Sequence, residues 1–360
     1  MKNELGHLQE KASRLPEGWS DPEVVEDTVV ADGIELRRAG LSSTGPEGEE
    51  LTGSAVEADT SPLARSYYEL LERVSTLEQL RDRRASYELR TLDGEPMGAC
   101  AADDVFLESD APARWRYARS NGVALHTNWR NAALRAFCEL AERDRVLRAW
   151  YGEILPRRLA FTPAATPLEN AQSYEWLAYA FPEKVPSPGF SHGVHVAGVF
   201  GFPTCAEAPL VMGYGGRLDP SEAVDAAVRE AMQTLAFLWG EPLLEAPPHP
   251  APTPMHHLEY FQCRRHHAIL RSWLDGSHAR YREREWDTGR ARTRSGSSRH
   301  VRGPAATSSP GISLVDLTPA WLGGGLRVAK AVCATAAPLA FGEIPFTAHL
   351  PPELRVHPIA

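Results

Sequence analysis

Two segments of the sequence carry glutamates three residues apart within otherwise apolar stretches. The segment "SYYELLERVS" (66–75) holds Glu69 and Glu72, and "FCELAERDRV" (137–146) holds Glu139 and Glu142, with an arginine directly after each second glutamate. In a helix, side chains three residues apart lie on the same face. Each segment is therefore predicted to present a patch of two carboxylates.

Paired carboxylates repel each other unless something compensates their charge. They remain ionised together at low cost only if water or cations surround them, and their hard oxygen ligands favour Mg²⁺. A third segment, "VREAMQTL" (228–235), places Glu230 and Gln233 at the same spacing. Three such helices would converge on one polynuclear Mg²⁺ site that holds the phosphates of a nucleotide. If the faces are solvated, the pairs are ordinary surface features, and spacing alone leaves both interpretations open.

The elements that must position these residues are visible in the apolar pattern. Helices are predicted after Thr60 or Ser61 with Pro62 at the first position, over about 133–150, and from Pro220 to Gly240. Strands are predicted at "GVHVAGVFGF" and "APLVMGYGG", and near the end at "GISLVDLTPAW" and "LRVAKAVCATAAPLAF". Residues 44–62 are predicted to form a loop, and residues 276–310 a mobile basic loop or a basic loop that meets an acidic partner.

Composition restricts the class of protein. At 360 residues with 43% hydrophobic residues, one large domain or two interleaved lobes are expected. A net charge of −9 argues against a nucleic-acid binder. Five cysteines without a CxxC spacing indicate a reducing, cytoplasmic protein rather than a disulfide framework. No apolar run approaches the ~20 residues of a membrane span, and the N-terminus has no apolar signal segment.

Several familiar motifs are missing. There is no GxxxxGK[ST], and "GYGGR" (213–217) does not fit GxGxxG, so nucleotide binding would have to depend on carboxylates and metal. The two dihistidine pairs at 256–257 and 266–267 lack the i, i+4 spacing of a zinc site. No nucleophile with a local partner is present, and no catalytic side chain is assigned.

In chain order, "ARSYYELLERVS", "SNGVALHTNWRNAALRAFCELAERD" and "DPSEAVDAAVREAMQTLAFLWG" resemble the three signature blocks of the YcaO family, ATP-dependent enzymes that activate peptide-backbone amides. The resemblance covers roughly residues 40–360. It implies an α/β fold of mixed sheets with packed helices that carry the ATP- and Mg-binding glutamates. It also implies an N-terminal extension over 1–45 and a YcaO-like domain over 46–360.

The resemblance implies roles for individual residues. The implied Mg²⁺ ligands are Glu69, Glu72, Glu139, Glu142 and Glu230. The residues implied to contact ATP are Ser66, Arg73, Ser120, Asn121, Arg143 and Gln233. The sequence departs from the family pattern in three places: "TGSAVEAD" replaces a GKG-like element, Leu235 replaces a frequent basic residue, and the chain ends in His357-Pro358-Ile359-Ala360 where PHPFP is common.

The implied function is ATP-dependent cyclodehydration of Cys, Ser or Thr to thiazoline or oxazoline in a ribosomally synthesised peptide, as in the biosynthesis of thiazole/oxazole-modified bacteriocins. Thioamide formation and a noncatalytic scaffold are the alternatives. The implied partners are a precursor peptide, an E1-like or leader-recognition protein and a second copy in a homodimer. Neither a nucleic acid nor a membrane is expected as a partner.

Overall fold

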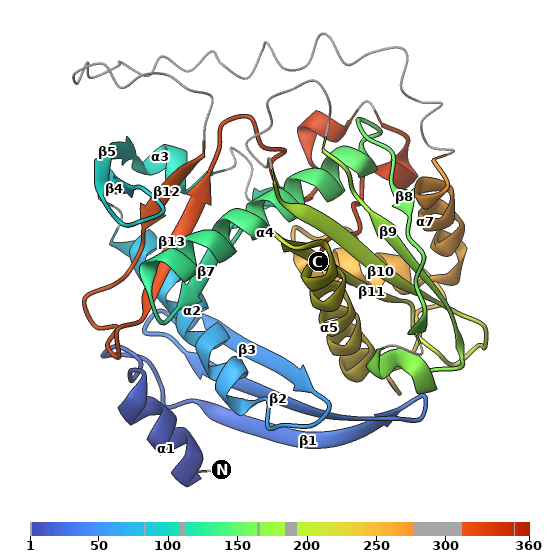
Figure 1. Cartoon of the computed structure of the whole chain (residues 1–360), viewed down its shortest axis with the longest axis horizontal. Coiled ribbons are helices and arrows are strands. Elements are labelled where there is room, and N and C mark those ends of the chain that lie inside the picture. Colours follow the sequence, from blue (N-terminus) through green and yellow to red (C-terminus); the bar gives the residue numbers. More distant parts are fainter. Residues whose placement is uncertain are drawn as a thin grey trace.

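A computed structural model describes residues 2–82, 84–108, 113–163, 166–183, 193–276, 312–348 and 350–360. Within them, seven α-helices pack against four β-sheets, and every strand pair is antiparallel (Figure 1). This confirms the α/β class. The loop predicted at 276–310 lies outside the described residues, apart from Gly276.

A three-stranded sheet forms the N-terminal part of the chain. After α1 (Lys2–Lys11), the strands β1 (Glu23–Ala31), β2 (Ile34–Thr44) and β3 (Glu50–Glu57) pair in that order. The prediction of a loop over 44–62 is wrong for β3, whose small residues let its backbone approach α2 (Leu63–Arg81) closely. A Cβ on Gly53 would lie 2.1 Å from the Ser66 carbonyl oxygen. The sheet crosses the boundary expected at residue 46, and the division into an N-terminal extension and a YcaO-like domain stays a prediction.

A five-stranded sheet lies between two helices. Its strand order is β5-β4-β12-β13-β7, so β7 lies at one edge. Helix α2 covers one face through an apolar cluster that includes Val123 and Val328, and α4 (Trp129–Trp150) covers the other through a cluster with Ala124 and Ala329. The strands are β4 (Ser86–Arg90), β5 (Pro96–Ala101), β7 (Val123–His126), β12 (Ser313–Asp316) and β13 (Arg327–Val332); α3 (Ala102–Val105) follows β5.

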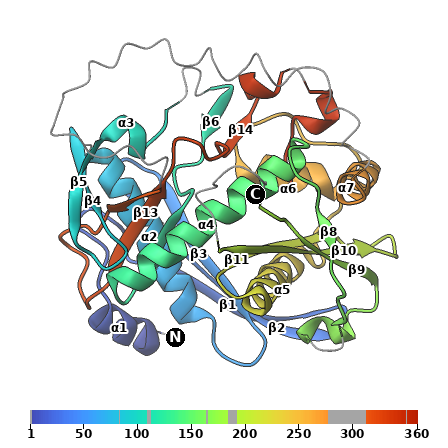
Figure 2. The same cartoon turned by 45° about the horizontal axis from the view of Figure 1, so that its top comes forward.

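A four-stranded sheet, ordered β11-β10-β9-β8, supports the third predicted helix. Helix α5 (Pro220–Leu238) packs on it, and the Asp219 side chain caps α5 by accepting from the Ser221 and Glu222 amides. Helix α4 runs from the five-stranded sheet to this one (Figure 2). The remaining elements are β8 (Arg157–Arg158), β9 (Tyr174–Ala180), β10 (His195–Pro203), β11 (Val211–Arg217), α6 (Pro254–Gln262), α7 (His267–Leu274), and a small sheet of β6 (Trp115–Tyr117) and β14 (Ala340–Gly342).

The three expected helices and the strands around 195–203 and 211–217 are confirmed. Helix α2 begins one residue later than expected, with Pro62 at the N-cap and no side-chain cap; the Ser61 hydroxyl accepts from the Leu63 amide at 3.4 Å. In the described part of the chain, no helix combines the length and apolar character needed to cross a membrane.

Candidate functional site

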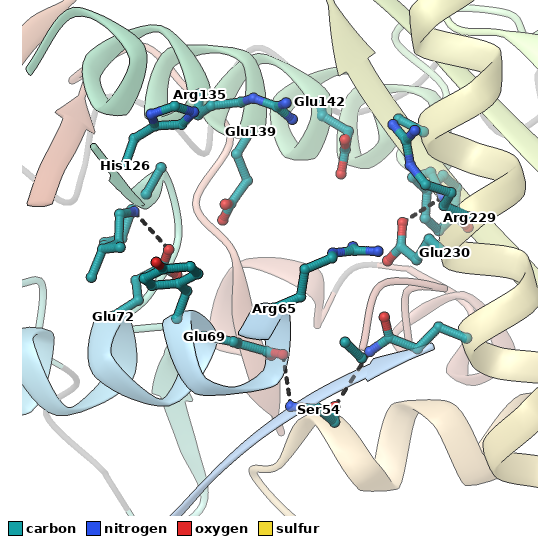
Figure 3. Close-up of a pocket in the computed structure, with 18 of the residues that line it drawn as sticks. Ser54, Arg65, Glu69, Glu72, His126, Arg135, Glu139, Glu142, Arg229 and Glu230 are labelled. Carbon is teal, nitrogen blue, oxygen red and sulfur yellow. Dashed lines mark hydrogen bonds between the residues drawn. The ribbon is translucent and has the colours of Figure 1, made fainter. Parts of the chain in front are cut away.

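A cavity of about 550 Å³ lies where α2, α4 and α5 meet the strands β3, β7 and β11 (Figure 3). Five glutamates and five arginines line it, together with polar, aromatic and aliphatic groups. The glutamates are Glu69, Glu72, Glu139, Glu142 and Glu230, and the arginines are Arg65, Arg135, Arg143, Arg217 and Arg229. The structure thus brings all five predicted metal ligands to one cavity.

Backbone amides orient four of the five glutamates. Each accepts one hydrogen bond from an N–H of a neighbouring strand or of the turn before β7. The donor–acceptor pairs are Ser54 to Glu69 at 2.8 Å, Leu125 to Glu72 at 2.8 Å, Gly122 to Glu139 at 3.1 Å and Tyr214 to Glu230 at 2.6 Å. Fixing one carboxylate oxygen in this way leaves the other oxygen of Glu72, Glu139 and Glu230 available for a ligand. The second oxygen of Glu69 accepts a hydrogen bond from Arg73.

Glycines on β11 bring two of the helices together at the cavity. A Cβ on Gly213 or Gly215 would lie 2.2 Å from a backbone carbonyl of α5, and a Cβ on Gly216 would lie 2.5 Å from the Cys138 carbonyl of α4. Without side chains at these positions, the strand packs directly on both helices. The "GYGGR" segment therefore helps to position Glu142 and Glu230 rather than forming a phosphate loop.

Burial strongly perturbs the ionisation of these glutamates. Burial, followed by the nearby Glu139, raises the pKa of Glu72 to about 8. Burial raises the pKa of Glu139 to about 7, with Arg143 opposing the increase and Glu142 adding to it. The pKa of Glu230 is likewise raised to about 7 by burial, against the effect of Arg143. These carboxylates therefore need a cation in the cavity to be fully ionised at neutral pH.

The chemistry of the donor set fits Mg²⁺ held jointly with a phosphate ligand. Among the described residues, no group of three His, Cys, Asp or Glu side chains is placed to hold a metal ion. Mg²⁺ commonly binds through one or two carboxylates together with substrate phosphates and water, rather than in an all-protein cage. Glutamates distributed around one cavity suit that mode of binding.

The arginines supply the opposite charge. Arg143 lies beside Glu142, with Nε 3.4 Å from Oε1, and the surrounding glutamates raise its pKa despite burial. Burial lowers the pKa of Arg217 and Arg229, and nearby arginines lower it further. Cations crowded in this way favour an anion between them. A cavity with both signs of charge suits a metal–phosphate complex.

The six predicted ATP contacts divide into three groups: two residues line the cavity, one is buried in the core, and three lie beside the cavity lining. Arg143 and Gln233 line the cavity, and Gln233 Nε2 donates to Ser54 Oγ at 3.3 Å. Ser66 is fully buried and donates to the Ala39 carbonyl at 3.0 Å, so it supports the contact between β2 and α2.

The other three predicted contacts lie beside the cavity lining. Arg73 donates to Glu69 at 2.6 Å and to the Thr52 carbonyl at 2.7 Å. Ser120 and Asn121 form the turn before β7; the Val123 amide donates to the Ser120 carbonyl at 3.1 Å. Their contact with ATP stays a prediction.

Sequence reasoning missed several lining residues. Arg65 and Arg135 each stand four residues before the first glutamate of a pair, so both helices carry RxxxExxER, a repeat that would have indicated them. Nothing local in the sequence indicates the remaining polar lining residues, which are Ser54, Tyr68, His126, Tyr214, Arg217 and Arg229. Leu235 stands where the family frequently has a basic residue, and its side chain is fully buried in the core beneath α5.

The C-terminal residues pack next to this site. His357 is fully buried, and its Nε2 lies 2.8 Å from the Ala340 carbonyl oxygen. The Tyr214 hydroxyl donates to the Pro358 carbonyl at 3.1 Å, while the Tyr214 amide donates to Glu230. One lining residue therefore connects a glutamate to the chain end.

Comparison with known proteins agrees with this arrangement. The family model described as YcaO cyclodehydratase, ATP- and Mg²⁺-binding, matches residues 96–336. The fold is similar to that of YcaO from Methanopyrus kandleri bound with AMPPCP and Mg²⁺, with a TM-score of 0.57, 17% identity, and coverage of 93% of this chain and 89% of that one. It is also similar to a heterocyclase in complex with substrate and cofactor, with a TM-score of 0.54, 14% identity, and coverage of 94% of this chain and 52% of the heterocyclase. No curated protein matches the chain.

Proposed function

Because the chain belongs to the YcaO family, whose description includes ATP and Mg²⁺ binding, we propose that it uses ATP to activate backbone amides of a ribosomally synthesised peptide. The product we favour is a thiazoline or oxazoline made by cyclodehydration of Cys, Ser or Thr. The single observation that carries the proposal is the cavity lined by five glutamates and five arginines. Its volume of about 550 Å³ lies within the usual range for small-molecule sites.

The side chains have distinct tasks in this proposal. Glu69, Glu72, Glu139, Glu142 and Glu230 hold the cations, and backbone hydrogen bonds keep all of them except Glu142 oriented before the ligand binds. The arginines and Gln233 contact the phosphate chain. Bound Mg²⁺ supplies neutralisation of charge along the transferring phosphoryl group, a process that requires little covalent help from the protein.

The proposed reaction joins a side chain of the peptide to the carbonyl carbon of the preceding residue and consumes one ATP. A thiol or hydroxyl of the substrate loses its proton to solvent and attacks the preceding carbonyl carbon, which forms a C–S or C–O bond and moves the carbonyl π electrons onto the oxygen. The former carbonyl oxygen accepts the γ-phosphoryl group of ATP, which leaves ADP. The bond between this carbon and the phosphorylated oxygen then breaks, the oxygen departs as part of phosphate, and loss of the amide proton to solvent leaves a C=N bond. The similarity to a heterocyclase solved with its substrate favours this product over a thioamide or a noncatalytic scaffold.

A second protein completes the system in our proposal. The family resemblance implies a separate E1-like or leader-recognition protein that recruits the peptide, and we propose such a partner here. The chain spans 52% of the heterocyclase that it resembles. The protein is proposed to act as a homodimer on a precursor peptide.

Calorimetry of ATP binding with Mg²⁺ tests the site. We expect the native protein to bind and the Glu72→Ala/Glu142→Ala double variant not to bind, with Arg130→Ala as a control on the exposed face of α4. Mass spectrometry of peptide products then distinguishes the chemistries, because each azoline loses one water whereas a thioamide exchanges oxygen for sulfur. Absence of ATP binding by the native protein would contradict the proposal.

A further inference from the structure

Lys330 is a buried charged residue beside the site, with no place in the mechanism above. It lies on β13 and is 5% exposed. Its ammonium group donates to the Arg119 carbonyl at 2.9 Å and to the Asn121 carbonyl at 2.8 Å. Burying an ammonium group is costly, so a lysine retained here needs specific partners. Both carbonyls belong to the turn before β7.

That turn presents an amide to a predicted metal ligand. The Gly122 N–H donates to Glu139 Oε1 at 3.1 Å, and the Ala331 N–H donates to the Gly122 carbonyl at 2.8 Å. Gly122 has φ of +68°, and a Cβ there would lie 2.9 Å from the Ala331 carbonyl oxygen. Strand β13 therefore holds the turn through two adjacent residues, one using its backbone and the other its ammonium group.

We propose that Lys330 is a positioning residue for the metal–nucleotide site, acting through the turn at 119–122 to fix Glu139. The inference rests on the proposed function. The ammonium group holds the carbonyls on either side of Ser120, which sets the direction of the Gly122 amide. That amide then orients one oxygen of Glu139 and leaves the other for the cation. Partners that orient metal ligands in this way contribute about 10–100-fold to metal affinity.

A role for Lys330 through its charge alone and a role in positioning the turn predict opposite effects of its removal on Mg²⁺ binding. The positive charge of Lys330 interacts with Glu139, so it also disfavours a second cation nearby. If Lys330 acted only through its charge, removing it would tighten Mg²⁺ binding. If it positions the turn, removing it weakens Mg²⁺ binding because Glu139 loses its fixed orientation. The sign of the change therefore separates the two roles.

The experiment measures the Mg²⁺ concentration that half-saturates ATP binding, by calorimetry on the full-length chain. We expect Lys330→Met to raise this half-saturating Mg²⁺ concentration about 10-fold or more. Arg327→Met, which removes an exposed cation from the same strand, is the matched control and should leave it unchanged. If Lys330→Met does not fold, Lys330→Gln takes its place with the same expectation, because its shorter side chain cannot span to both carbonyls.

The outcomes separate this inference from the proposed function. Suppose that the native protein binds ATP in a Mg²⁺-dependent manner, but the half-saturating Mg²⁺ concentration of the folded Lys330 variant is unchanged or lower. That result overturns the positioning role of Lys330 and leaves the proposed function intact. An equal increase in the half-saturating Mg²⁺ concentration of Arg327→Met would also overturn the positioning role, because any loss of positive charge would then have the same effect. Native protein that binds no ATP overturns both.

Discussion

The Leu125 amide of β7 donates to Glu72 Oε2 at 2.8 Å, which joins the first glutamate helix to the edge of the five-stranded sheet. Leu125 and Glu72 are 53 residues apart in sequence. The bond uses an edge-strand donor that would otherwise need water or another strand. It also orients a carboxylate that burial makes difficult to ionise.

Glu72→Gln should make the ligand-free protein more stable at alkaline pH. The folded-state pKa of Glu72, about 8, exceeds its ordinary value of 4.5, so ionisation costs stability progressively as pH rises between these values. The amide avoids that cost and can still accept from Leu125. We expect the Tm to rise by roughly 2 °C at about pH 8.5, with a smaller difference near pH 5. Glu343→Gln, at an exposed ion pair, should show no such pH-dependent gain.

Binding of Mg²⁺ and ATP should release protons at neutral pH. Metal coordination requires ionised carboxylates, whereas Glu72, Glu139 and Glu230 have raised pKa values of about 8, 7 and 7. Affinity should therefore increase from about pH 6 and level off above about pH 8. Calorimetry in two buffers with different ionisation enthalpies measures the released protons. The same heat in both buffers at pH 7 would refute the prediction.

Arg229→Ala should lower the affinity for ATP more than the affinity for AMP. Arg229 of α5 lines the cavity among like charges, and the loss of a charge-assisted contact to phosphate should weaken ATP binding about tenfold. AMP binding should change much less, because AMP lacks the β- and γ-phosphates. Arg130→Ala, whose guanidinium pairs with Asp93 on the exposed surface, provides the control for general charge. Equal losses for AMP and ATP would place Arg229 away from the terminal phosphates.

Gly213→Ala should destabilise the protein, because the new methyl group would meet the Ala227 carbonyl oxygen at 2.2 Å and the Ala231 nitrogen at 2.3 Å. We expect a loss of about 1–3 kcal/mol in the free energy of unfolding. Gly40→Ala, in β2 with no atom within 4 Å of the added carbon, should be neutral or slightly stabilising. Denaturant unfolding measures both. A Gly213→Ala variant as stable as the native protein would show that β11 can move away from α5.

The sequence by itself determined the local elements and the residue types at the site. Helical spacing placed Glu69 and Glu72 on one face of a helix, and the Asp219-Pro220 start of α5 was predictable from capping preferences. Apolar patterning also indicated β10 and β11. These features depend on interactions within a few residues, so a single sequence can reveal them.

Only the tertiary structure decided which backbone groups and cations meet the glutamates. The amides of Leu125 and Tyr214 reach Glu72 and Glu230 through sheet edges that no local pattern specifies. Strand β3 was missed because its small residues have little strand preference and are selected for close packing on α2. Lys330 gains its partners only when β13 pairs with β7, more than 200 residues apart along the chain. Such contacts arise from the global packing of the chain, which local propensity does not encode.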